Sequence, residues 1–423
     1  MFIGAVFLVL LNGAGGCIIN IMNLLATIFE VNDLTSQVLS FVWASWFVWV
    51  PLVLFFMFWE IWLLYIRILH VSGLSWVLLE VRVPRTQMKS PRAMEMVFNA
   101  LHRTKEGNPF EKYWQGFVKQ WFSFEIASNG GDVRFFVRAP AGLRRLVEAQ
   151  IYAQYPDTEI IEVDDYTKAL PLDMPNTEYN LWGAEFGATK EDAYPIKTYV
   201  DFKMEDMKEE MEKADPMSSL LEFMGSIHQG EYVWAQFNIR AADDKWIEEG
   251  IKLKDKILGR DKPAKEGVFT KAMALSPGER EIMTALERNM EKLGFDSGIR
   301  MMYIARRDVF SPVNIASITG VLKQYNTKNL NGFKPVKTVS VEWPWEMIAP
   351  YKVHKEFENQ RKMLRAYRER GYFYPPFSKD RKSMVLTSEE LATIYHYPGM
   401  TVSTPTFART DTKKGAPPTN LPI

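Results

Sequence analysis

Cysteine is nearly absent from this chain, and the residue patterns of several common catalytic and metal sites are missing. The single cysteine, Cys17, lies in an apolar stretch, so a fold stapled by disulfides is excluded. The five histidines are scattered without metal-ligand spacing, and Asp164 and Asp165 suit a turn or helix cap better than a metal site, so we expect no bound metal. The sequence G-x-S-x-G of many serine hydrolases does not occur either.

A phosphate-binding loop and an excess of charge of either sign are also missing. No G-x-x-x-x-G-K-[ST] sequence occurs, so residues 1–423 contain no P-loop motor. The 51 basic residues equal the 51 acidic residues, so there is no overall attraction to nucleic acid or acidic lipid. We therefore expect a protein without a cofactor and without enzymatic activity. An enzyme that has no recognisable motif is the remaining alternative.

The first 58 residues are mostly apolar and contain two charged side chains. Their second half, residues 38–59, is apolar throughout and about as long as the roughly 20 residues that a helix needs to cross the hydrocarbon core. The first half is long enough too, although a cleaved signal peptide or lipidation at Cys17 is an alternative there. No Lys or Arg precedes its apolar run, which argues against both alternatives. We predict a transmembrane hairpin in residues 1–70, with helices at about 3–28 and 38–66.

The loop between the two predicted spans is acidic, whereas basic residues follow the second span. Glu30 and Asp33 lie in the loop, and Arg67, Arg82 and Arg85 are the first basic residues after it. Cytoplasmic segments tend to carry the excess of Lys and Arg. We therefore expect a two-pass protein of the cell membrane, in contact with lipid, with both termini and the soluble domains in the cytoplasm.

Short strands alternate with amphipathic helices after the membrane segment, which indicates the α+β class. Residues 74–168 are predicted as β-α-β-β-α-β, the order of a ferredoxin-like split βαβ unit. A Pro- and Asn-rich connection leads to residues 195–342, where we predict a second ferredoxin-like α+β domain with a helical insertion. Its first strand is expected at 196–202 and its last at 338–341, and Ser276 begins a capping box within it.

The C-terminal part differs in character: residues 350–400 are expected to form helices, and residues 401–423 a disordered, proline-rich tail. A capping box at Thr387 to Glu390 is predicted to begin the last of these helices. Within residues 351–370, apolar positions recur at spacings of three and four, as in a heptad seam, and the other faces are basic. The first interpretation is a solvated helix that docks on the body through its seam; the alternative is a helix that faces nucleic acid or lipid. The candidate contacts to nucleic acid on this helix are Arg361, Arg365 and Arg368.

Arg134, Phe136 and Arg138 alternate along a predicted strand and therefore share one face of the sheet. RNA-recognition modules present aromatic and basic side chains on such a face, so these three residues are candidate nucleic-acid contacts. Tyr232 and Trp234 in the second domain form a similar pair. The strand lacks the glycines of the RNA-recognition signature, and packing against the neighbouring domain is the alternative.

Four segments resemble a known group of proteins. They are residues 78–86 (LLEVRVPRT), 136–167 (FVRAPAGLRRLVEAQIYAQYPDTEIIEVDDYT), 386–399 (LTSEELATIYHYPG) and 413–422 (KKGAPPTNLP). Together they resemble the membrane-anchored amino-terminal region that precedes the motor in HerA/FtsK-like ATPases, which are related to the ATPases of type IV secretion and conjugation. In that group the helix of the third segment and the proline-rich tail lead into the nucleotide-binding domain. The candidate docking residues in this helix are Glu389, Glu390, Tyr395 and His396.

The predicted anchor, the missing catalytic patterns and this resemblance together predict a non-enzymatic membrane scaffold. Its expected partner is a separate P-loop motor ATPase that moves DNA or protein across the membrane in a type IV secretion-like or DNA-transfer machine. We expect a homo-oligomer, because motors of this kind form rings. The alternative function is a membrane-anchored nucleic-acid-binding protein that uses the basic and aromatic sheet face and the basic helix.

Overall fold

The computed structural model describes residues 40–84, 89–104, 106–204, 215–258, 275–341, 347, 349–374 and 383–398. The chain divides into two compact units, Met1–Tyr65 and Ile66–Ile423. The second unit holds the sheet and its covering helices, and each unit is described by itself below. The predicted tail, residues 401–423, lies outside the described residues.

Among the described residues, α4 (Trp46–Ser72) is the one helix long and apolar enough to cross a membrane. Its apolar side chains are mostly exposed, and Pro51 lies inside it, as membrane helices tolerate. Signal sequences share this length and composition. The helix continues past the predicted end at residue 66. The other predicted span, 3–28, lies outside the described residues, so the two-pass hairpin and its orientation stay predictions.

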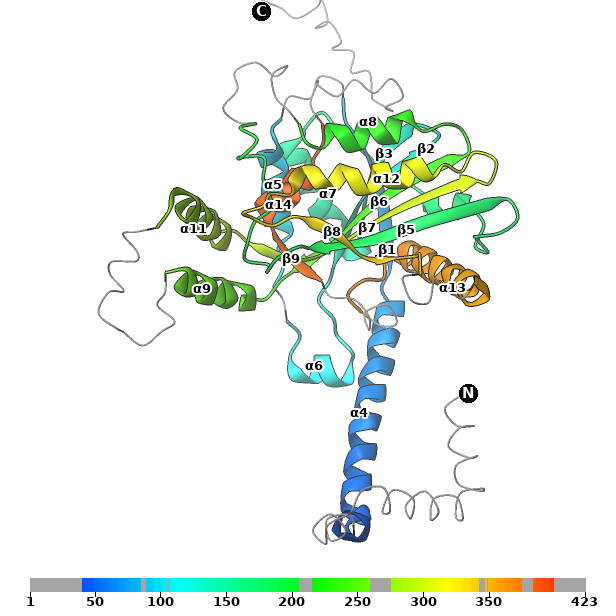
Figure 1. Cartoon of the computed structure of the whole chain (residues 1–423), viewed down its shortest axis with the longest axis vertical. Helices are drawn as coiled ribbons and strands as arrows, with labels where there is room; N and C mark the ends of the chain where they lie inside the picture. The colour runs from blue at the N-terminus through cyan, green and yellow to red at the C-terminus, as the bar shows by residue number, and fades with distance from the viewer. Residues whose placement is uncertain are drawn as a thin grey trace, which may run out of the picture. The chain divides into compact units, whose positions relative to one another are not determined.

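The strands of the second unit form one nine-stranded sheet in which each described pair is antiparallel (Figure 1). The strand order is β4-β1-β3-β2-β6-β7-β5-β8, and β9 pairs with β7 beside this path. The bounds are β1 (Trp76–Arg82), β2 (Phe122–Asn129), β3 (Asp132–Pro140), β4 (Glu159–Glu162), β5 (Tyr179–Ala188), β6 (Glu231–Ala241), β7 (Gly294–Arg306), β8 (Phe333–Thr338) and β9 (Met384–Thr387).

Helices cover both faces of this sheet. The bounds are α5 (Pro91–Leu101), α6 (Pro109–Trp114), α7 (Arg144–Gln154), α8 (Ser218–Ser226), α9 (Lys245–Ile257), α11 (Pro277–Met290), α12 (Pro312–Val321), α13 (Ala349–Arg368) and α14 (Ser388–Ile394). Phe124 of β2 faces α5 and α14, with its ring centroid 5.0 Å from Phe98 and 5.1 Å from Tyr395. On the other face, the ring of Trp234 of β6 lies 5.3 Å from the ring of Tyr367 of α13. Successive side chains along a strand point to opposite faces of the sheet, so the strands contact helices on both faces.

The α+β class is confirmed, and the elements predicted for residues 74–168 appear in the expected order β1, α5, β2, β3, α7, β4, with α6 as an addition. The finer ferredoxin-like assignment stays a prediction. The strand expected at 196–202 is wrong, since turns and irregular backbone occupy it. Instead β5 forms within the connection that precedes it, and β8, the last strand of the predicted second domain, ends at Thr338 rather than beginning there.

The strands of the two predicted α+β halves are hydrogen-bonded to each other. β2 pairs with β6 in a continuous register from Phe122 opposite Ile239 to Asn129 opposite Tyr232. The core consequently extends through the whole of the second unit. In the described residues the two halves therefore share one core, and no free sheet face separates them.

Candidate functional site

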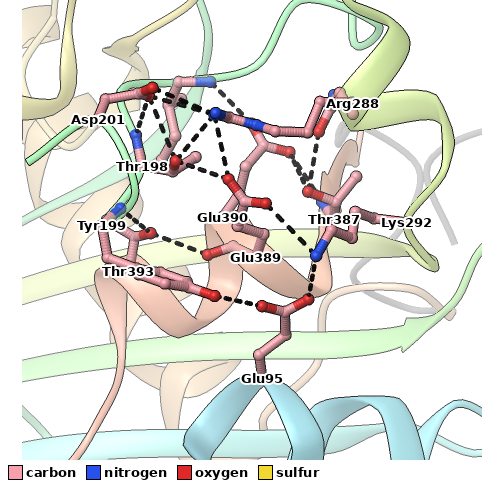
Figure 2. Close-up of polar contacts among 12 residues, drawn as sticks. Glu95, Thr198, Tyr199, Asp201, Arg288, Lys292, Thr387, Glu389, Glu390 and Thr393 are labelled. Carbon is pink, nitrogen blue, oxygen red and sulfur yellow. Dashed lines mark hydrogen bonds and ion pairs between the residues drawn. The ribbon is translucent and has the colours of Figure 1, made fainter. Parts of the chain in front are cut away.

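A buried group of polar side chains fixes α14 to the body, as Figure 2 shows. The predicted capping box at the start of this helix is confirmed: the Thr387 N–H donates to Glu390 Oε2 at 2.8 Å, and the Thr387 hydroxyl lies 3.0 Å from the same oxygen. The other oxygen of Glu390 accepts the Ile196 N–H at 2.8 Å. Burial raises the pKa of Glu390 to about 7, although these donors act in the opposite direction.

Glu389 lies on the adjacent side of the same turn, among hydrogen-bond donors and cations. Its Oε1 accepts the Thr198 hydroxyl at 2.7 Å and lies 3.2 Å from Arg288 Nη2. Its Oε2 lies 3.5 Å from Lys292 Nζ, which also contacts Glu95 of α5 at 2.7 Å. The two cations come from α11 and the residues just after it, so α14, α11 and α5 are joined through charged groups (Figure 2).

The segment after β5 completes this group. The Tyr199 N–H donates to the Thr393 hydroxyl at 3.0 Å, and the Tyr199 hydroxyl donates to Glu95 at 2.5 Å. Asp201 accepts from Arg288 at 3.2 Å. The cluster is therefore built from parts of the chain that are far apart in sequence, and each charged group in it has an opposite charge beside it or a hydrogen-bond donor. Such an arrangement positions a helix, and the charged side chains of Arg288, Lys292 and Asp201 remain about one third exposed at its rim.

A second buried pair lies at the other end of α14. His396 Nε2 is 3.1 Å from Asp215 Oδ2, and His396 Nδ1 is 2.9 Å from the Ala392 carbonyl oxygen. Burial by itself lowers the pKa of His396, but the carboxylate of Asp215 outweighs it and raises that pKa above the ordinary value. The pKa of Asp215 is correspondingly held below its usual range, since the imidazolium outweighs the effect of burial.

The four candidate docking residues of the sequence analysis lie in the interior. Glu389 and Glu390 are 4% and 1% exposed, and Tyr395 and His396 are 0% and 2% exposed. The structure thus brings all four together, but as core residues of the chain's own fold. In this conformation they are not accessible for direct contact with a partner, because α14 and Tyr395 are enclosed by α5, by β2, β3 and β6, and by the segment after β5.

Glu390 makes the stability of the protein depend on pH. A carboxyl group whose pKa is raised in the folded state binds a proton on folding, so the free energy of unfolding falls as pH rises from about 4.5 to about 7. Glu390→Gln is expected to remove this fall, roughly 2–4 kcal/mol in full. The measurement is urea unfolding of the detergent-solubilised full chain at several values between about pH 5 and about pH 8.

The neighbouring His396 acts in the same direction, because its raised pKa gives stabilisation that is lost as pH rises. The Glu390→Gln variant therefore keeps part of the dependence. Glu281→Gln, at an exposed position on α11, is the matched control and is expected to follow the parent chain. Identical slopes for the parent and Glu390→Gln would contradict the assignment.

The opposite face of the sheet carries a second buried network, which sequence reasoning missed. Arg370, just after α13, donates from Nε and Nη2 to Glu125 of β2 at 2.9 and 3.0 Å. It also donates to Asp165, which caps a short 3-10 helix (Tyr166–Ala169) by accepting the Thr167 N–H, as the sequence predicted. Burial by itself raises the pKa of Glu125, but the guanidinium of Arg370 outweighs it and holds that pKa below the usual range.

This network continues across the junction of the two predicted halves. Gln236 of β6 lies directly opposite Glu125 and donates to it at 3.1 Å. Its amide oxygen accepts from Arg300 of β7 at 2.9 Å, and Arg300 in turn pairs with Glu185 of β5 at 2.9 Å. The sequence did contain a signal for this buried network, because the charged residues Arg300 and Glu125 each interrupt an apolar run within a strand.

Arg134, Phe136 and Arg138 share the face of this network, because Phe136 pairs directly with Glu125. Phe136 is 4% exposed and stacks on Tyr166 with ring centroids 4.7 Å apart. Arg138 lies over the Trp76 ring at 4.5 Å and donates to the Glu369 carbonyl oxygen. Arg134 is exposed and pairs with Asp132 at 2.6 Å. The chain's own side chains therefore cover two of the three candidate residues.

A small cavity of about 170 Å³ opens beside Arg134, and Trp234, Tyr232 and Tyr166 are among its lining residues. It is the part of this face on which an aromatic ring from outside could stack next to an arginine. Sequence reasoning placed three of these side chains on the face, but Tyr166 comes from the 3-10 helix and could not be foreseen from strand alternation.

The three arginines of α13 point to different neighbours. Arg361 lies over the Phe357 ring at 4.6 Å, and Arg365 is 2.8 Å from Glu369 on the exposed side. Arg368 donates to the carbonyl oxygens of Leu170 and Pro171 at 2.9 and 2.8 Å. The buried residues of the helix are Met363, Leu364, Ala366 and Tyr367, so its C-terminal half docks on the sheet, while Val353 is 68% exposed.

Within the described part of the chain, no group of three or more His, Cys, Asp or Glu side chains is placed to hold a metal ion. A search of curated proteins returned no match to this sequence. The family model described as "Domain of unknown function (DUF8128)" matches residues 69–410, from the end of α4 to beyond α14. That description assigns no activity, so the link to HerA/FtsK-like ATPases rests on the sequence resemblance alone. By the extent of this match, the chain belongs to the DUF8128 family.

Proposed function

We propose that this protein is a non-enzymatic, membrane-anchored scaffold that docks a separate HerA/FtsK-like motor ATPase in a type IV secretion-like or DNA-transfer machine. In this proposal α4 spans the cell membrane, the sheet unit lies in the cytoplasm, and the segment after α14 contacts the motor. The protein acts as a homo-oligomer that matches the ring of the motor. The sheet unit contains two α+β halves of ferredoxin-like type.

The observation that carries this proposal is the way in which the C-terminal segment is built into the sheet. β9 pairs with β7 from Met384 to Thr387, and α14 is held by the cluster around Glu389 and Glu390. A chain that leaves the body after this helix starts from a fixed position. The resemblance in residues 386–399 and 413–422 concerns the same stretch, where related proteins continue toward their motor.

The docking proposal is tested by purifying the full chain from native membranes in detergent and identifying the co-purifying proteins by mass spectrometry. We expect a stoichiometric P-loop ATPase. Deleting residues 403–423 is expected to remove most of it while the sheet unit keeps its fold, because the deletion lies beyond α14. A variant with the same residues 403–423 in scrambled order controls for length and composition. Equal recovery of the ATPase with the intact, deleted and scrambled tails would contradict the proposal.

The alternative is a membrane-anchored nucleic-acid-binding protein, and the cavity beside Arg134 favours it. Base stacking on aromatic side chains next to an arginine is a common mode of single-strand binding. The same purification distinguishes the two functions. Nuclease-sensitive nucleic acid in place of an ATPase would support the alternative and exclude the scaffold.

A further inference from the structure

α6 presents three aromatic side chains to its surroundings. This short helix has no buried residue, and Phe110, Tyr113 and Trp114 are 60%, 42% and 59% exposed. Exposed aromatic side chains of this size, grouped on one turn, are unusual on a surface that faces only water. The helix is nevertheless well defined, since Asn108 and Glu111 form a capping box with Pro109 at the first helical position.

The position of α6 is fixed by contacts with the last turns of α4, inside the second unit. Gly116 follows α6 with a φ of +68°, and a Cβ added there would lie 2.2 Å from the Ile66 carbonyl oxygen. Only glycine permits this close approach. Phe117 adds an edge-to-face contact with His70, with ring centroids 5.8 Å apart. The aromatic side chains are thus held beside the part of the sheet unit from which α4 leaves it.

Charged groups surround the same place. A cavity of about 440 Å³ lies between α6 and the sheet, and its lining includes the cations Arg67, Lys112, Lys119 and Arg240 and the carboxylates Glu106, Asp243 and Asp296. Lys119 pairs with Asp243. Lys112 and Lys119 pair with Glu106, at 2.6 and 3.4 Å. No described carboxylate forms an ion pair with Arg67, which lies one residue after Ile66 on α4.

Aromatic side chains with an apolar body and a polar edge favour the headgroup level of a bilayer, and Lys and Arg beside them bind lipid phosphate. We propose that α6 inserts Phe110, Tyr113 and Trp114 into the headgroup region of the phospholipid bilayer that α4 crosses, with Arg67 on lipid phosphate. This second contact fixes the tilt of the sheet unit against the membrane. The inference rests on the membrane span of the proposed function and does not depend on a motor.

The test uses the full chain in vesicles of phosphatidylcholine and phosphatidylglycerol, with Cys17→Ser so that one introduced cysteine carries a bimane fluorophore. Lipids with a nitroxide near the headgroup are expected to quench most of the fluorescence of a label at Trp114→Cys. A label at Tyr152→Cys, an aromatic position on α7 that is 40% exposed, is the matched control and is expected to keep its fluorescence. Phe110→Cys is a second test position, in case the first variant fails to fold.

A label at Leu54→Cys, inside α4, separates the two ways in which the inference can fail. If lipids with a nitroxide deep in the acyl chain quench Leu54→Cys while the labels on α6 behave like the one on α7, the span stands and the α6 inference is overturned. If the label in α4 is not quenched either, the span itself fails and the inference falls with it. If the α6 labels are shielded from solvent only when other membrane proteins are present, this surface binds a protein partner. That result would also overturn the inference.

Discussion

Arg370→Met is expected to lower the free energy of unfolding by about 3–5 kcal/mol, because it leaves Glu125 and Asp165 charged without their partner in the interior. Arg370 is 0% exposed and donates to both carboxylates. The methionine side chain fills most of the same volume, so the loss reports charge and hydrogen bonding more than packing. The measurement is the urea midpoint of the detergent-solubilised full chain.

Two further variants make this prediction specific. Arg365→Met, four residues before Glu369 on the exposed side of α13, breaks a surface ion pair and is expected to cost about 1 kcal/mol at most. Adding Glu125→Gln to Arg370→Met is expected to restore part of the loss, because one of the unpaired charges is removed. Equal destabilisation by Arg365→Met and Arg370→Met would show that the buried network does not stabilise the fold.

Tyr395→Ala is expected to cost about 3–5 kcal/mol and to expose the C-terminal segment to proteases. The ring of Tyr395 lies 5.1 Å from Phe124, 5.9 Å from Phe135 and 5.8 Å from Phe237, and these residues belong to three different strands. Truncation to alanine therefore leaves a cavity where α14 meets the sheet. Limited proteolysis and the urea midpoint measure the two effects.

Tyr395→Phe keeps the ring contacts and is expected to remain close to the parent chain, which isolates the contribution of the ring. Tyr152→Ala removes a tyrosine at an exposed position on α7 and is expected to stay within about 0.5 kcal/mol of the parent. A cleavage pattern of Tyr395→Ala that matches the parent would contradict the central position of this ring.

Local sequence patterns were sufficient to predict many of the helices and strands. The capping boxes at Ser276 and Thr387 were predicted from four-residue sequences and are present. β1, β2 and β3 follow from alternating apolar residues. β5 escaped prediction because Gly183 and Gly187 interrupt its pattern of side chains.

Relations between distant parts of the chain could not be inferred from such patterns. The pairing of β2 with β6 joins segments separated by the whole of α7, β4 and β5, and no local feature specifies it. Glu389 and Glu390 were predicted as docking residues, a role that requires accessible side chains. Their burial depends on Arg288, Lys292 and the Ile196 N–H, which come from elsewhere in the chain. The docking role of these residues therefore stays a prediction, and their burial could not be inferred from the local sequence.

The short ladder between β9 and β7 determines how the body would respond to mechanical force. A pull between the start of β1 and the end of α14 passes through the pairs β1–β3, β3–β2, β2–β6, β6–β7 and β7–β9 in series. β6 and β7 are paired from Glu231 to Ala241, whereas β9 contributes Met384 to Thr387 alone. The β7–β9 ladder is the shortest of these, so β9 and α14 would detach first, once the contacts of α14 with α5 and around Glu389 have broken, and the other ladders would stay closed.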